Sequence, residues 1–202
     1  MSLEKELTEK LKNKSADFVR YVDISHLSNK QNKQFASAIL IGVALSPDFI
    51  QDLTNITDYV EKLRLNNLVK KDEFHIKESK MDKLADEIAD YLISKGYPSY
   101  SQSENNIYTT GFFDENNKTT PLPHKTIALL AGLGWIGKHN LLVTPEFGSA
   151  ICMCTVLTDA PLPTVLHTAP KSLCGDCTIC EDICSVKALK GTPGKLESLE
   201  MK

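Results

Sequence analysis

Four cysteines near the carboxyl end constrain this chain more than any other feature. Cys174, Cys177, Cys180 and Cys184 follow the spacing C-x2-C-x2-C-x3-C, which is the run that binds iron-sulfur clusters in bacterial ferredoxins. Four thiolates within so short a segment would repel one another unless a cationic centre neutralised their charge. The spacing therefore predicts that these four cysteines hold a 4Fe-4S cluster.

Other fates of the cysteines stay open. A tetrahedral zinc site is one, although structural zinc usually takes two C-x2-C knuckles with a longer gap between them. A redox dithiol pair and buried thiols that act as small apolar groups are the others. Ser185 stands where the ferredoxin run commonly has proline, and no cysteine follows Cys184. Either Cys184 closes a single cluster, or Cys152 or Cys154 supplies the fourth thiolate, or a second run lies beyond Lys202.

Charge and hydropathy exclude several classes of protein. The formal net charge is −3, and no dense stripe of lysine and arginine offers a surface for phosphate backbones. No run of about 18 apolar residues is present to cross a bilayer. We therefore expect a cytoplasmic protein with reduced cysteines, no membrane association and no nucleic-acid partner.

Hydrophobic periodicity predicts an alternation of helices and strands. An amphipathic first helix is indicated by Leu3, Leu7 and Leu11, and Phe18 and Val19 extend its apolar stripe. Helices are expected over residues 52–68, 81–96 and 122–130, buried strands over 38–45, 141–143 and 150–158, and an exposed loop over 114–120. Prolines between 161 and 170 predict a linker. The chain is thus divided into a domain over 1–165 and an iron-sulfur segment over 166–202.

Three glycines form a pattern that is typical of dinucleotide binding. Gly132, Gly134 and Gly137 satisfy G-x-G-x-x-G, whose mechanism needs a strand before the first glycine and a helix after the last. Here a helix is predicted to run into the glycines and a strand to follow them. We therefore do not expect a dinucleotide at this site.

The same block carries a family resemblance. The residues from Ala131 to Pro163, AGLGWIGKHNLLVTPEFGSAICMCTVLTDAPLP, and the run CGDCTICEDIC resemble the epoxyqueuosine reductase family. The TPE-aromatic-G and T-D-x-P-L pieces are also similar to those of reductive dehalogenases. Both families join a cobalamin-binding domain of nitroreductase-like fold to a ferredoxin-type tail with two 4Fe-4S clusters. The resemblance implies an α+β fold for this short, divergent chain, with a nitroreductase-like mixed sheet flanked by helices and a short ferredoxin-like segment.

The resemblance also implies a cofactor site. A corrinoid would be flanked by backbone and side chains of Gly132, Gly134, Gly137, Lys138, Thr144, Pro145, Glu146, Phe147 and Gly148. Glycines would let the chain approach a flat macrocycle closely. The alternative is that they cap a helix and turn a corner. Trp135 would likewise cover a cofactor or fill the core.

The chain departs from the family just before the glycine block. Epoxyqueuosine reductases carry a D-S-A-P-x-L-E stretch there, and its Asp is the presumed proton donor. Lys118 occupies the position of that Asp, and His124 that of the Glu. We therefore do not expect activity on tRNA, and no catalytic residue is assigned. His124, His139, Tyr59 and Tyr108 remain candidate proton donors.

Three functions follow from these observations. The first is an oxidoreductase that reduces a small molecule with a 4Fe-4S cluster and a corrinoid, and that receives electrons from a donor protein. The second is a cofactor-free electron-transfer or partner subunit. The third is a structural zinc-binding protein.

Overall fold

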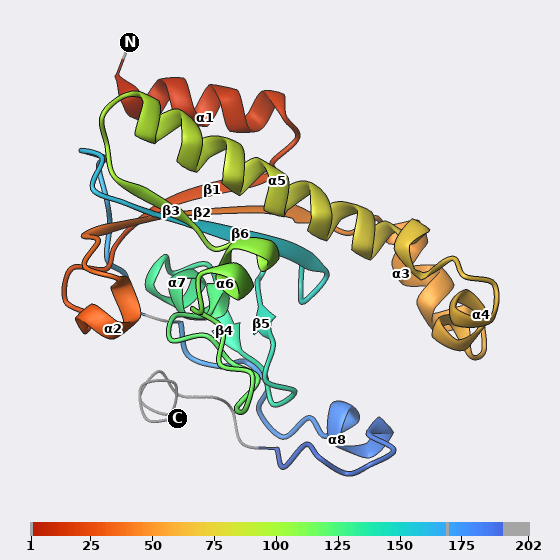
Figure 1. Cartoon of the computed structure of the whole chain (residues 1–202). Coiled ribbons are helices and arrows are strands. Elements are labelled where there is room, and N and C mark those ends of the chain that lie inside the picture. Colours follow the sequence, from red (N-terminus) through yellow and green to blue (C-terminus); the bar gives the residue numbers. More distant parts are fainter. Residues whose placement is uncertain (1, 169, 192–202) are drawn as a thin grey trace.

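A four-stranded sheet with helices on both faces forms the body of the protein (Figure 1). The computed structural model describes residues 2–168 and 170–191. The strands lie in the order β1-β2-β6-β3, with bounds Phe18–Asp23, Ser37–Ala44, Ile151–Thr158 and Ser99–Ser101. Every pairing between these strands is antiparallel, and one isolated parallel bridge joins Val22 to Val165. The α+β class is confirmed, but the expected mixed sheet is antiparallel apart from that bridge.

The sheet separates two cores because successive side chains of a strand point to opposite faces. Cys152, Cys154 and Val156 of β6 face the layer formed by α1 (Leu3–Asn13) and α5 (Glu73–Ser94). Leu157 and Met153 face the opposite layer, which contains α7 (His124–Leu130) and a hairpin of β4 (Trp135–Ile136) and β5 (Leu142–Val143). The strands predicted over 38–45 and 150–158 are confirmed as the two central ones.

The first helix is shorter than predicted from its apolar stripe, which was expected to extend to Phe18 and Val19. Helix α1 ends at Asn13, and Ser15 adopts a left-handed backbone with φ of 66°. Phe18 and Val19 therefore do not continue the helix but begin β1. Aromatic and β-branched residues at these positions suit a pleated strand between two cores.

The helix predicted over 52–68 is two helices, α3 (Pro47–Asn55) and α4 (Tyr59–Leu65). Asp58 breaks them apart with a left-handed φ of 57°. The spacing of apolar residues such as Ile56, Val60 and Leu63 predicts one core-facing helix over this range, and that prediction is wrong for α4, which has no buried residue. The helix predicted over 81–96 is part of α5, which begins earlier, at Glu73, and ends at Ser94; Gly96 follows that end with φ of 90°.

The remaining elements are short. They are α2 (Asn29–Asn32), the 3₁₀ turn η1 (Val69–Lys71), α6 (Glu104–Thr109) and α8 (Ile179–Ile183). In Figure 1 the segment with α8 hangs below the face of the sheet that carries α7 and the hairpin. Among residues 2–168 and 170–191, no helix is both long and apolar enough to cross a membrane.

The proline-bearing stretch runs back along the body before it reaches the cysteines. The backbone N–H of Val165 donates to Tyr21 O at 3.0 Å, and that of His167 donates to Leu130 O at 2.8 Å. The domain boundary near residue 165 stays a prediction. Residues 192–202 of the predicted iron-sulfur segment lie outside the described residues.

Candidate metal centre

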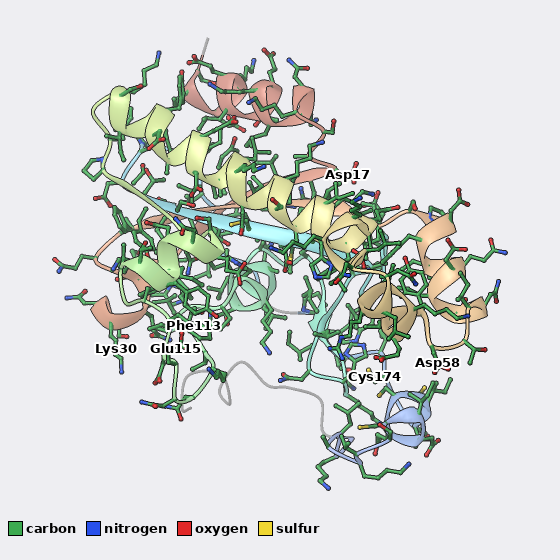
Figure 2. All side chains as sticks on the ribbon, turned by 45° about the vertical axis from the view of Figure 1, so that its right-hand side comes forward. Asp17, Lys30, Asp58, Phe113, Glu115 and Cys174 are labelled. Atoms are coloured by element: carbon green, nitrogen blue, oxygen red, sulfur yellow. The ribbon has the colours of Figure 1, made fainter. Side chains whose placement is uncertain are left out.

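A pocket of about 480 Å³ lies between the β4–β5 hairpin and the cysteine segment. Trp135, Lys138 and His139 line it from the hairpin side, and Cys174, Cys177 and Cys180 line it from the other side. Figure 2 shows Cys174 where the chain passes from the body to the segment with α8. The structure thus brings three of the four predicted ligands to one cavity, facing the block that carries the family resemblance.

The glycine run shapes the hairpin that forms one wall. Gly132 follows α7 with φ of 66°, a conformation that favours glycine. A Cβ on Gly134 would lie 2.0 Å from the carbonyl oxygen of Val143, and one on Gly137 would lie 2.7 Å from Cε1 of His139. Each of the three glycines therefore serves the chain's own packing. The predicted order of helix, glycines and strand is confirmed.

The loop from Thr144 to Gly148 closes on itself. The backbone N–H of Thr144 donates to Gly148 O at 2.8 Å, and that of Phe147 donates to the Thr144 hydroxyl at 2.9 Å. The Phe147 ring stacks on Phe18 at 6.0 Å between centroids. Of the residues that the resemblance assigned to a corrinoid, Lys138 lines the pocket, whereas Phe147 packs against the core.

Lys138 ties the cysteine segment to the hairpin. Its ammonium donates to the carbonyl oxygen of Cys177 at 2.9 Å and lies 3.8 Å from the carboxylate of Glu181. The Lys138 side chain is only 12% exposed. A positive charge is therefore held beside the cysteines in a partly desolvated position, where its field is stronger than at the surface.

Hydrogen-bond donors surround two of the cysteine sulfurs. The Ser172 hydroxyl and the Lys138 backbone N–H lower the pKa of Cys174. Backbone N–H groups of Leu189 and Ala188 lower the pKa of Cys184, and the Ala188 N–H lies 3.3 Å from its Sγ. Because thiolates are the metal-binding form of cysteine, these donors favour the state that a metal centre needs.

The four thiols do not converge on one point. In the described part of the chain, no group of three or more His, Cys, Asp or Glu side chains is close enough to hold a metal ion. The ligand type nevertheless fits, because soft thiolates select iron-sulfur clusters or zinc. The assignment of Cys174, Cys177, Cys180 and Cys184 as ligands stays a prediction.

Cys152 and Cys154 lie on the other side of the sheet, in the core under α5. Burial raises the pKa of Cys152 to about 12, and it raises that of Cys154 as well, with Asp82 contributing. A thiol that resists ionisation is a poor ligand. Their surroundings fit small apolar residues of a central strand.

The candidate proton donors are scattered. Only His139 lines the pocket among the four that the sequence suggested, and its Nδ1 accepts from the Leu141 N–H at 3.0 Å. His124 bonds the Thr155 hydroxyl through Nδ1 at 2.9 Å, and burial lowers its pKa to about 4. Lys118, at the position of the family's Asp, is exposed and paired with Glu115.

Sequence reasoning missed two contacts here. Neither the bond from Lys138 to the Cys177 carbonyl nor the position of Trp135 against the cysteines was predicted. The two segments are 39 residues apart in the chain. The signal that could have suggested the contact is the joint appearance of both blocks in the resemblance.

Comparisons with known proteins come from sequence and from structure. No family model matches the chain. It is 45% identical over 71 residues to an epoxyqueuosine reductase of Synechococcus sp. (strain CC9605), which is 35% of this chain and 22% of that protein. It is 39% identical over 71 residues to the epoxyqueuosine reductase of Xanthomonas campestris pv. campestris, covering 35% and 19%.

Solved structures show a similar fold over most of the chain. An epoxyqueuosine reductase in complex with an epoxyqueuosine-modified tRNA-Tyr stem loop superposes with a TM-score of 0.55 at 18% identity, covering 93% of this chain and 52% of that one. The catabolic reductive dehalogenase NpRdhA, in complex with 3-bromo-4-hydroxybenzoic acid, gives a TM-score of 0.60 at 16% identity, covering 88% and 24%.

The chain spans about half the length of the epoxyqueuosine reductase structure, and the sequence match covers about a fifth of the two curated relatives. The matches that were found confirm the suspected resemblance. The chain is therefore similar in sequence to epoxyqueuosine reductases over about a third of its length, and its fold is similar to theirs and to that of the reductive dehalogenases.

Proposed function

We propose that this chain is an iron-sulfur redox protein whose cysteine segment holds a 4Fe-4S cluster and passes single electrons to a small substrate. One observation carries the proposal. Cys174, Cys177 and Cys180 line one pocket with Lys138, and all four belong to the blocks on which the family resemblance rests. A bound cluster would supply one-electron chemistry.

The residues of the pocket suit a centre that gains negative charge. The Lys138 ammonium and the N–H groups around Cys174 and Cys184 stabilise thiolate and any added electron. Val143 and Leu173 provide apolar walls. Such walls limit the access of water, and solvent exposure is one of the factors that set a cluster's potential.

The similar fold of the corrinoid-binding families raises the question whether this chain also binds a corrinoid. The glycines of the block are occupied by the chain's own packing, so they form no open cradle. Pockets for drug-sized ligands measure about 300–1,000 Å³, and a corrinoid is larger than such ligands, whereas this pocket measures about 480 Å³. The described residues therefore do not present a corrinoid site, and the proposal contains no step through one.

An electron-transfer subunit is the second candidate, and the proton donors favour it. Reduction of a carbon centre needs protons as well as electrons. His124 is buried and neutral, and Lys118 is exposed and paired, which leaves His139 as the candidate donor at the pocket. Titration of the anaerobic protein with hydroxocobalamin should show no tight binding, and tight binding would contradict both candidates, because neither contains a corrinoid.

The cluster itself is tested by metal analysis. Protein purified without oxygen and supplied with iron and sulfide should contain about four of each per chain. Cys177→Ser should lose most of the iron. The matched control is Cys152→Ala, which removes a buried thiol of the sheet and should keep it. Colourless, iron-free wild-type protein, or protein with one zinc per chain, would contradict the proposal.

A further inference from the structure

Trp135 is the one tryptophan of the chain. The indole Nε1 is buried and has no hydrogen-bond partner among the described residues. A buried donor without a partner loses its hydrogen bonds to water and gains none in return, which destabilises the folded chain. Such a group therefore needs an explanation.

The position of the indole suggests what the N–H is for. Trp135 lines the pocket together with Cys174, Cys177 and Cys180. Tryptophan can only donate through Nε1, and a sulfur can only accept from it.

The hairpin holds the ring in place. Trp135 pairs with Val143 across β4 and β5, and the adjacent Gly134 lets the two strands approach closely. The donor is therefore preorganised on a rigid turn, while the cysteine segment is joined to that turn by Lys138. A fixed donor beside a metal centre can tune it without binding the metal.

We propose that the Trp135 indole N–H donates a hydrogen bond to a sulfur of the cluster and thereby raises the reduction potential of the cluster. This inference rests on the proposed cluster. Reduction adds negative charge to the sulfurs, so a donor stabilises the reduced state more than the oxidised one. Trp135 is in this sense a positioning residue, because it acts through the cluster and touches no substrate.

The test removes the N–H and little else. Trp135→Phe keeps an aromatic ring, and growth of a tryptophan auxotroph on 3-benzothienylalanine replaces the NH of the single indole by sulfur at nearly the same size. Loss of the bond should lower the equilibrium constant for cluster reduction roughly tenfold, which for a one-electron couple is about 59 mV. Cys152→Ala changes the core on the other side of the sheet and leaves this wall intact, so its midpoint potential should match that of the wild type.

The outcomes separate the two proposals. A wild-type protein that binds no iron overturns the cluster and this inference together. A wild-type cluster whose midpoint potential equals that of both Trp135 replacements overturns the inference and leaves the cluster intact. A measurement without any variant is available as well. Protein labelled with ¹⁵N in its indole should show a hyperfine coupling between this nitrogen and the reduced cluster, and the lack of that coupling would also overturn the inference.

Discussion

Gly134 offers a sharp test of how the pocket wall is built. A Cβ at this position would lie 2.0 Å from the carbonyl oxygen of Val143, 2.8 Å from its carbonyl carbon and 3.0 Å from Cα of Thr144. All three atoms belong to the backbone, so no side-chain rotation relieves the collision. Gly134→Ala must therefore separate β4 from β5.

The magnitude follows from the cost of overpacking. Extra methyl groups in a packed site cost about 1–3 kcal/mol, and a collision with backbone belongs at the upper end. For a chain of this size each kcal/mol lowers the melting temperature by about 2–4 °C. Gly134→Ala should thus lower it by about 6–12 °C, measured by circular dichroism on protein without iron.

Gly148→Ala is the matched control. Gly148 has φ of 57° but open space where a Cβ would stand, so only backbone strain of roughly 1–2 kcal/mol is expected. If Gly134→Ala destabilises the iron-free protein no more than Gly148→Ala does, the packing argument is wrong. In that case Gly134 would be reserved for a ligand, as the resemblance implied.

Three further predictions concern charge and partners. Burial lowers the pKa of His124 from 6.5 to about 4. As the pH falls, the His124 imidazole therefore becomes protonated in the unfolded chain at a higher pH than in the folded chain. Stability to urea should therefore drop by about 2 kcal/mol between pH 7 and pH 5, and an equal drop in His124→Gln would refute this. Lys138→Met should lose iron faster in air than Lys125→Met, because the Lys138 ammonium donates to the Cys177 carbonyl whereas that of Lys125 donates to Asn140. Equal rates of iron loss would show that Lys138 does not stabilise the centre. A tRNA-Tyr stem loop should show no saturable binding in fluorescence anisotropy at physiological salt, because the net charge is −3, and saturable binding would contradict our expectation.

Periodicity located the central strands because these run through two cores. Residues 38–45 and 150–158 are apolar on both faces, which is the pattern of a strand covered from both sides, and they form β2 and β6. The start of β1 was missed for a related reason. Phe18 and Val19 continue the spacing of Leu3, Leu7 and Leu11, and the left-handed turn at Ser15 leaves no mark in that spacing.

Only one side of the candidate site, the cysteine run, could be predicted from the sequence. The cysteine run is local, so its ligand type could be predicted from its spacing alone. The wall that faces it comes from a hairpin far upstream, and contacts such as that between Lys138 and Cys177 depend on the folded chain. The glycines were open to two interpretations because close approach to a ligand and close approach to backbone demand the same residue.

The proposed function requires that thiolates of the cysteine segment hold a cluster that accepts one electron. Electron paramagnetic resonance of the anaerobically reconstituted, dithionite-reduced protein tests it most directly. We predict a signal of a half-integer-spin cluster that integrates to about one spin per chain and is lost in Cys177→Ser but kept in Cys152→Ala. Reduced protein that is silent in this measurement, and that contains zinc or no metal, would contradict the account.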